Sequence, residues 1–172
     1  MMKRIYLFSI VMLMNVFSYG QVEGHLAIAP IIGYNANGVP SLSIGTAIGH
    51  LDGYYSAYGT GLTIEGLIPL KKNEPWGMKF GLRKFCASLE GFGIDLSLDM
   101  IRYQLNNDKE WHLSPSIGWT LIGFLNLKYA YSAPLMNAEG INISRHQFTT
   151  QIFIPIVVKP WRDIFASKRK DK

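Results

Sequence analysis

Hydrophobic and polar residues alternate along most of this 172-residue chain. In the segment FLNLKYAY, residues 124–131, leucines and tyrosines occupy every second position, and Asn126 and Lys128 lie between them. Successive side chains of a strand point to opposite faces, so the segment predicts a strand with one apolar and one polar face. A soluble sandwich buries such an apolar face, whereas a transmembrane barrel turns it toward lipid. The rest of the sequence has to decide between these two folds.

Eight extended segments with this pattern are predicted. They are residues 25–34, 41–50, 55–68, 76–88, 94–104, 111–122, 124–133 and 146–158. Several reach ten residues or more, which suits tilted membrane strands of about 9–11 residues better than the usual globular strand of about 5–6. Their polar faces are rich in glycine, serine, threonine and charges of both signs, which is typical of the lining of a narrow barrel.

The connections between these segments alternate between short and long. The short ones lie at 51–53, at 90–93 and near Gly123, the longer ones at 69–75, 106–110 and 134–145, and the first, at 35–38, is short but loop-like. A transmembrane barrel shows this alternation, with tight turns at its periplasmic end and longer loops outside. One irregularity, at Lys84, predicts a bulge or a lysine that snorkels at the periplasmic rim.

Residues 1–20 have the layout of a secretory signal peptide. Lys3 and Arg4 precede an apolar run, and Ser18 and Gly20 supply small residues at the two positions that a signal peptidase reads. The apolar run is only half of the roughly 20 residues that a membrane-spanning helix needs. The sequence therefore predicts cleavage before Gln21, a barrel domain over 21–158 and a basic periplasmic tail over 159–172.

Charged residues on the predicted inward faces are balanced in sign. They are Glu65, Lys79, Arg83, Asp95, Asp99 and Lys128. An unpaired charge in a confined interior costs several kcal/mol, so a balanced set indicates a salt-bridge network that plugs the lumen. Eight strands also enclose a space that side chains just fill. A gate or proton path through the carboxylates is the functional alternative to this structural network.

Aromatic residues fall near the predicted strand ends, where they can form two belts at the membrane interfaces. The outer belt consists of Tyr34, Trp76, Trp111 and Tyr131, and the inner belt of Tyr54, Tyr55, Phe92, Phe124 and Trp161. A chain with this much aromatic content also places rings near strand ends by chance, so the belts support the barrel without deciding it.

Strand number, alternating connections and period-two pattern over residues 22–158 resemble the small eight-stranded outer-membrane barrels, such as the OmpA transmembrane domain and OmpX. The resemblance implies an all-β, eight-stranded antiparallel up-and-down transmembrane barrel with short periplasmic turns and longer outer loops. Such proteins end at an aromatic residue of the last strand, which looks like an assembly signal. Here the chain continues beyond 158, so that signal would be internal, at Phe153 or Trp161.

Catalytic, metal and cofactor sites are not expected. Ser144, His146 and Glu139 lie together near the last outer loop, but no recognised nucleophile motif surrounds Ser144. A lipid-modifying enzyme would need Ser144 and His146 within hydrogen-bond reach at the rim. The other possible metal ligands are scattered without ligand spacing; they are His25, His50, His112 and Cys86.

The expected function is a structural or surface-contact role in a bacterial outer membrane, as a non-catalytic monomer. Its partners would be outer-membrane lipid and a surface or periplasmic protein, bound through the outer loops or the tail. The tail carries six basic and two acidic residues and indicates an interfacial segment. An exported chain without an aromatic-basic groove is not expected to bind nucleic acid. The alternative is a soluble periplasmic, lipocalin-like binder of an apolar ligand, with the apolar faces turned inward.

Overall fold

The structure is a computed structural model that describes residues 25–36, 39–52, 56–88, 92–121, 125–136, 141–154 and 156–160. Its strands are β1 His25–Ala36, β2 Ser41–Asp52, β3 Ser56–Pro69, β4 Trp76–Ser88, β5 Phe92–Leu105, β6 Asp108–Leu121, β7 Leu125–Tyr131, β8 Ala133–Met136, β9 His146–Phe153 and β10 Ile156–Pro160. No helix in these residues is long and apolar enough to cross a membrane. The predicted signal peptide and most of the tail lie outside the described residues.

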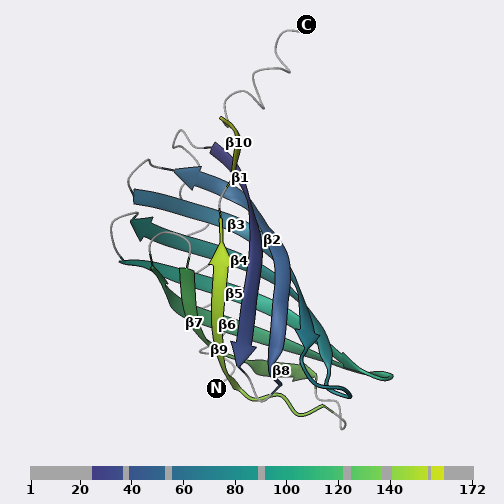
Figure 1. Cartoon of the computed structure of the whole chain (residues 1–172). Coiled ribbons are helices and arrows are strands. Elements are labelled where there is room, and N and C mark those ends of the chain that lie inside the picture. Colours follow the sequence, from purple (N-terminus) through teal and green to yellow (C-terminus); the bar gives the residue numbers. More distant parts are fainter. Residues whose placement is uncertain are drawn as a thin grey trace, which may run out of the picture.

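These strands form one closed antiparallel barrel (Figure 1). The barrel has eight strand positions around its circumference, which we call staves. Each of the strands β1 to β6 forms one stave. Strands β7 and β8 share the seventh stave because both pair with β6. Strands β9 and β10 share the eighth because both pair with β1. The seventh stave is interrupted at Ser132, between β7 and β8, and in the eighth β9 ends at Phe153 and β10 begins at Ile156. The predicted all-β, eight-stranded antiparallel barrel is thus confirmed.

Strand register fixes the tilt of the barrel. Stepping through paired residues from Leu26 round all eight staves returns to β1 at Ala36, ten residues along. With a strand spacing of about 4.8 Å and a rise of about 3.3 Å per residue, this offset tilts the strands by about 40° from the barrel axis. We call the end that carries the connections after β1, β3, β5 and β8 the distal end, and the opposite end proximal.

One expectation about local geometry is wrong, and one of the two alternatives at Lys84 is excluded. The connection expected as a longer loop at 106–110 is a two-residue turn, in which Leu105 pairs with Asp108 and Asn106 has φ 53°. Asparagine tolerates this left-handed conformation, so the β5–β6 hairpin closes tightly. The bulge considered at Lys84 is absent, since β4 pairs with β3 and β5 there without a register shift.

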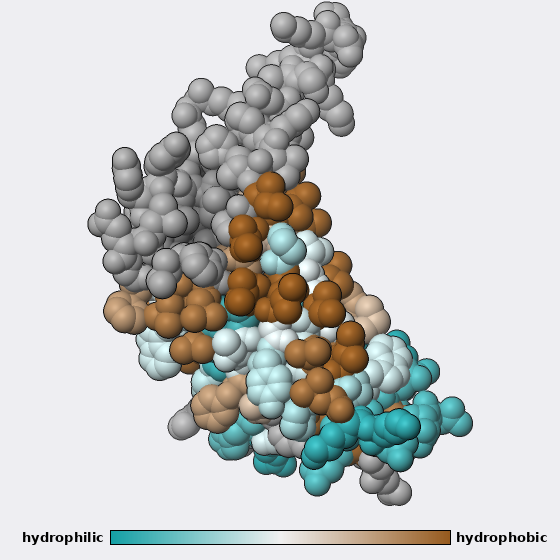
Figure 2. Space-filling view, in the orientation of Figure 1, coloured by the Kyte–Doolittle hydropathy of each residue, from teal (hydrophilic) through white to brown (hydrophobic). Residues whose placement is uncertain are grey.

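The burial pattern of the barrel is the reverse of a soluble protein's. Inward positions are mainly polar or charged, whereas outward positions carry large apolar side chains, such as Phe92 at 79%, Trp119 at 61% and Phe148 at 59% exposed. Apolar residues cover the middle and proximal part of the visible face, and hydrophilic residues gather at the distal end (Figure 2). The period-two pattern of the sequence therefore separates a polar interior from an apolar exterior.

Glycines on the inward faces allow strands to approach closely where the sheet coils. A Cβ added at Gly45 of β2 would overlap the carbonyl oxygen of Ile64 and lie 2.7 Å from Cα of Glu65, both on β3. At Gly66, on the opposite face of β3, the nearest atom would be 3.8 Å away. The close approach of β2 and β3 therefore requires glycine at position 45, whereas position 66 has room for a side chain.

We therefore expect Gly45→Ala to lower the free energy of unfolding by about 1–3 kcal/mol, because β2 and β3 must separate to admit the methyl group. Gly66→Ala is the matched control and should leave stability unchanged or slightly raised, since alanine reduces the freedom of the unfolded chain. Urea titration of both variants in detergent micelles measures the difference. Equal stability of the two variants would contradict the close β2–β3 approach.

Candidate functional site

The middle of the lumen holds a network of buried ions. All six charged residues predicted to line it are buried, each at most 7% exposed. They come from β3, β4, β5 and β7, whose inward faces meet across the narrow barrel. The Lys79 ammonium lies 2.7 Å from a carboxylate oxygen of Glu65, whose other oxygen accepts a 2.7 Å hydrogen bond from the Gln151 amide.

Asp95 is the centre of this network. Its carboxylate accepts from Arg83 Nε at 2.5 Å and lies 2.9 Å from the Lys128 ammonium. The Asn126 amide adds a third hydrogen bond of 3.0 Å. One fully buried carboxylate therefore serves two cations, an arrangement that offsets desolvation only while all of these partners are present.

Asp99, the remaining predicted member, differs from the others. Among the described residues it makes no ion pair within 4.0 Å; its carboxylate accepts a 3.1 Å hydrogen bond from Ser97 instead. The Ser97 hydroxyl also lies 2.6 Å from that of Ser116 and 3.5 Å from the Lys128 ammonium. Asp99 thus joins the same network through a serine.

Apolar side chains pack against the ions on their proximal side. Phe153 packs with Ile31 and Ala29, and its ring lies 4.3 Å from the Arg83 guanidinium carbon. A cavity of about 30 Å³ lies beside Ala29, Ala47, Arg83 and Phe153, which is room for water molecules rather than a lipid.

A second apolar cluster, which we call the distal lid, covers the other side. Residues from the connecting segments, Val39, Ile141 and Ile143, pack on three inward side chains. Those inward side chains are Leu67, Ile101 and Tyr103. Apolar side chains therefore border the ions on both sides, with Phe153 proximal and the distal lid distal.

A serine, an imidazole and a carboxylate lie close together beside Tyr103 of the distal lid, a set that the sequence did not reveal. The Ser132 hydroxyl lies 2.8 Å from His112 Nδ1, and His112 Nε2 lies 3.2 Å from a carboxylate oxygen of Glu110. Hydrolases use the same residue types. Here, however, the hydroxyl has no exposed surface and the Tyr103 ring packs edge-on against the imidazole, so the set is closed to substrate.

Ser144 and His146, considered for catalysis at the rim, make their side-chain hydrogen bonds to other groups. The Ser144 hydroxyl bonds to the main chain of His146, while the His146 imidazole lies 2.6 Å from the Tyr129 hydroxyl. Glu139 lies outside the described residues. No group of three or more histidine, cysteine, aspartate or glutamate side chains within the described ranges could hold a metal ion.

The predicted aromatic belts are only partly described. Tyr34 and Trp76 are exposed on the outward face of distal strand segments, Trp111 and Tyr131 are half-buried there, and Phe92 is exposed at the proximal end. Tyr54, Tyr55, Phe124 and Trp161 lie outside the described residues. The sequence missed that Tyr129, His146 and Phe148 join the distal group, with ring centroids 6.0 and 5.3 Å from that of Tyr129.

Comparison with known proteins adds no relative. No protein-family model matches the sequence, and no curated protein matches it significantly. Functional argument therefore rests on the geometry of this chain alone.

Proposed function

We propose that the chain is a small outer-membrane barrel of the kind that its sequence resembles, exported by its N-terminal segment and acting as a monomeric, non-catalytic envelope component. The observation that carries this proposal is the reversed burial pattern. Asp95 and Gln151 are fully buried, while Ile117, Trp119 and Phe148 are each more than half exposed. In water an outward surface of this kind drives aggregation; in a bilayer it is the expected lipid face.

The packed lumen supports a structural or surface-contact role over conduction. Ion pairs lie in the middle of the barrel, with Phe153 packed against them on one side and the distal lid on the other. A solute would have to displace the distal lid and break buried pairs. The distal loops and rim are then the surfaces available to partners.

The soluble-binder alternative fits these observations poorly. A lipocalin-like protein needs an apolar interior for its ligand and a polar exterior. Here the interior is charged, and the apolar cavity beside Phe153 is far too small for a lipid chain.

Fractionation of cells that express the full chain tests the proposal. We expect the protein to remain with the outer membrane after a carbonate wash and to migrate differently on a gel with and without boiling, because a closed barrel resists detergent until heated. A known periplasmic protein, released by the same wash, is the control. Recovery of the chain in the soluble fraction with no heat-dependent shift would overturn the membrane proposal.

A further inference from the structure

We propose that the outward face of the β5–β6 hairpin binds the phosphate group of an anionic membrane lipid through Arg102 and Lys109. This inference rests on the proposed membrane location. It concerns the exterior of the distal end, away from the ion network of the lumen.

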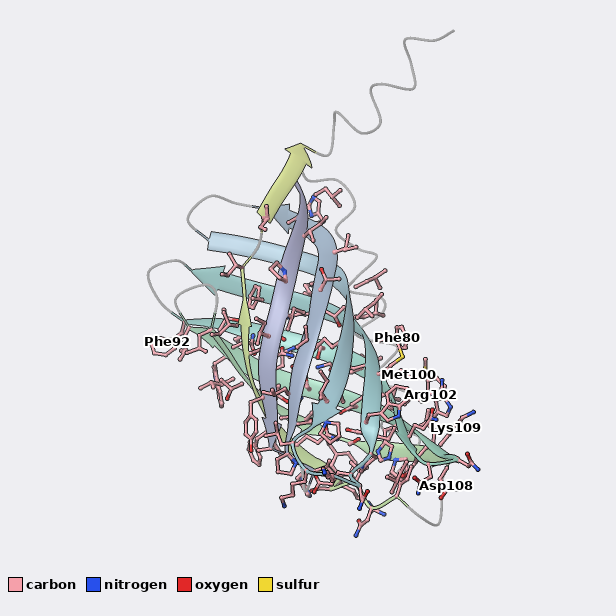
Figure 3. All side chains as sticks on the ribbon, turned by 45° about the vertical axis from the view of Figure 1, so that its right-hand side comes forward. Phe80, Phe92, Met100, Arg102, Asp108 and Lys109 are labelled. Atoms are coloured by element: carbon pink, nitrogen blue, oxygen red, sulfur yellow. The ribbon has the colours of Figure 1, made fainter. Side chains whose placement is uncertain are left out.

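Register places the two cations together. Arg102 pairs with Trp111, and Gln104 pairs with Lys109, so Arg102 and Lys109 are diagonal neighbours on one face, about 7–8 Å apart at their Cα atoms. Figure 3 shows both side chains on the distal part of this hairpin. An oxygen-bearing group between them can reach both, because each side chain is long and flexible.

Neither cation has a carboxylate partner among the described residues, in contrast to the lumen cations Lys79, Arg83 and Lys128, each of which lies within 4.0 Å of one. Arg102 Nη2 donates to the neutral side-chain oxygen of Gln104, at 2.9 Å. Its Nε is buried and finds no acceptor in the part of the chain that the structure describes. The half-buried guanidinium therefore has unused donors at a site where an anion would complete its hydrogen bonds.

Along the barrel axis, the site lies at the level where a lipid headgroup is expected. On β5 the outward residue before Arg102 is Met100, which pairs with Phe80, and both are exposed. These side chains belong to the apolar exterior, whereas Lys109 and Asp108 at the tip of the hairpin are polar and exposed. Arg102 therefore lies at the boundary between apolar and polar surface, where a bilayer presents its phosphates.

The chemistry favours a lipid over a free anion. A guanidinium can donate two parallel hydrogen bonds to a phosphate, and the lysine adds a second positive charge. The exposed side chains of Met100, Phe80 and Trp76 beside them offer apolar surface to acyl chains. Free phosphate would gain the ionic contacts but nothing from this apolar surface.

Native mass spectrometry of the full chain, refolded in dodecylmaltoside and titrated with phosphatidylglycerol, tests the site. We expect one tightly held phosphatidylglycerol on the unsubstituted protein and at least about tenfold weaker retention by the double variant Arg102→Gln, Lys109→Gln, given the strength of charge-assisted hydrogen bonds. Arg102→Lys should give an intermediate loss, because it keeps the charge and removes the paired donors. Lys71→Gln is the matched control and should retain the lipid, since Lys71 already pairs with Glu74 at 3.9 Å.

Probes and a folding check separate the outcomes. Diacylglycerol, which has the same chains and no phosphate, should be held no better by the unsubstituted protein than by the double variant. Equal phosphatidylglycerol retention by all variants would overturn the site, as would inorganic phosphate competing at the lipid's own concentration. Each variant is first checked for the heat-dependent gel shift. If the unsubstituted protein shows neither this shift nor carbonate-resistant membrane association, the proposed function fails and the lipid site with it; normal insertion with unchanged retention overturns the lipid site alone.

Discussion

Asp95→Asn should lower the free energy of unfolding by about 3–5 kcal/mol, because removing one partner leaves buried cations uncompensated. The substitution keeps the size of the side chain, so the loss reports charge rather than a cavity. Arg83 and Lys128 would both lose their carboxylate, and their side chains are only 3% and 6% exposed, so bulk water replaces it poorly. Urea titration of the refolded protein in micelles, read by the heat-dependent gel shift, measures the effect.

Two further variants make this prediction specific. Asp108→Asn makes the same chemical change at an exposed position on the hairpin tip and should alter stability by less than about 0.5 kcal/mol. Adding Lys128→Met to Asp95→Asn should recover part of the loss, because one of the orphaned cations is then removed. If Asp95→Asn is as stable as Asp108→Asn, the ion network does not hold the barrel closed.

Ile117→Arg should destabilise the membrane-inserted protein by about 2–4 kcal/mol, whereas Ile68→Arg should cost only about 0–1 kcal/mol. Both isoleucines face outward and are similarly exposed, at 54% and 51%. Ile117 lies within β6, away from either end, and Ile68 is one residue before the distal end of β3. A bilayer penalises a charge according to its depth, so these matched substitutions should differ.

Refolding both variants into phosphatidylcholine vesicles and measuring urea unfolding gives the comparison. In a soluble protein, two exposed surface positions of this kind would both change stability by less than about 0.5 kcal/mol. A difference of under 0.5 kcal/mol between the two variants in vesicles would therefore contradict a lipid-facing exterior, even if the protein folds.

Period-two alternation was sufficient to predict which side chains face inward. Glu65, Asp95 and Lys128 are buried because each lies on the polar face of its strand, and a face depends only on position along the chain. Partner choice needed register as well, since Asp95 meets Lys128 only after β5, β6 and β7 are aligned. The alternation pattern does not predict this register, because the register is set by turns such as the two-residue turn at Asn106.

The contacts that the sequence did not predict involve residues near turns and strand breaks. Ile141 and Ile143 belong to a segment expected as an outer loop, yet they fold back over the lumen to form the distal lid. The sequence also did not predict the contacts between Glu110, His112 and Ser132. Glu110 belongs to a segment that was expected to be a loop but is the start of β6, and Ser132 lies in the break between β7 and β8. Local pattern cannot report a contact between a loop and a distant strand; only the closed barrel brings them together.

Closure between the first and last staves makes the whole assembly cooperative. Every other stave pairs with its neighbours along the chain, but β1 meets β9 across nearly the full domain, as in the hydrogen bond from Thr149 to Asn35, 114 residues apart. An open sheet would leave Glu65 without Gln151 and Arg83 without the Phe153 ring. Partly assembled forms therefore carry exposed, unmatched charges and gain little of the final stability. The entropy lost in joining such distant segments is offset only by the contacts that form when the last stave pairs with β1. We therefore expect the barrel to fold cooperatively, with few partly assembled molecules.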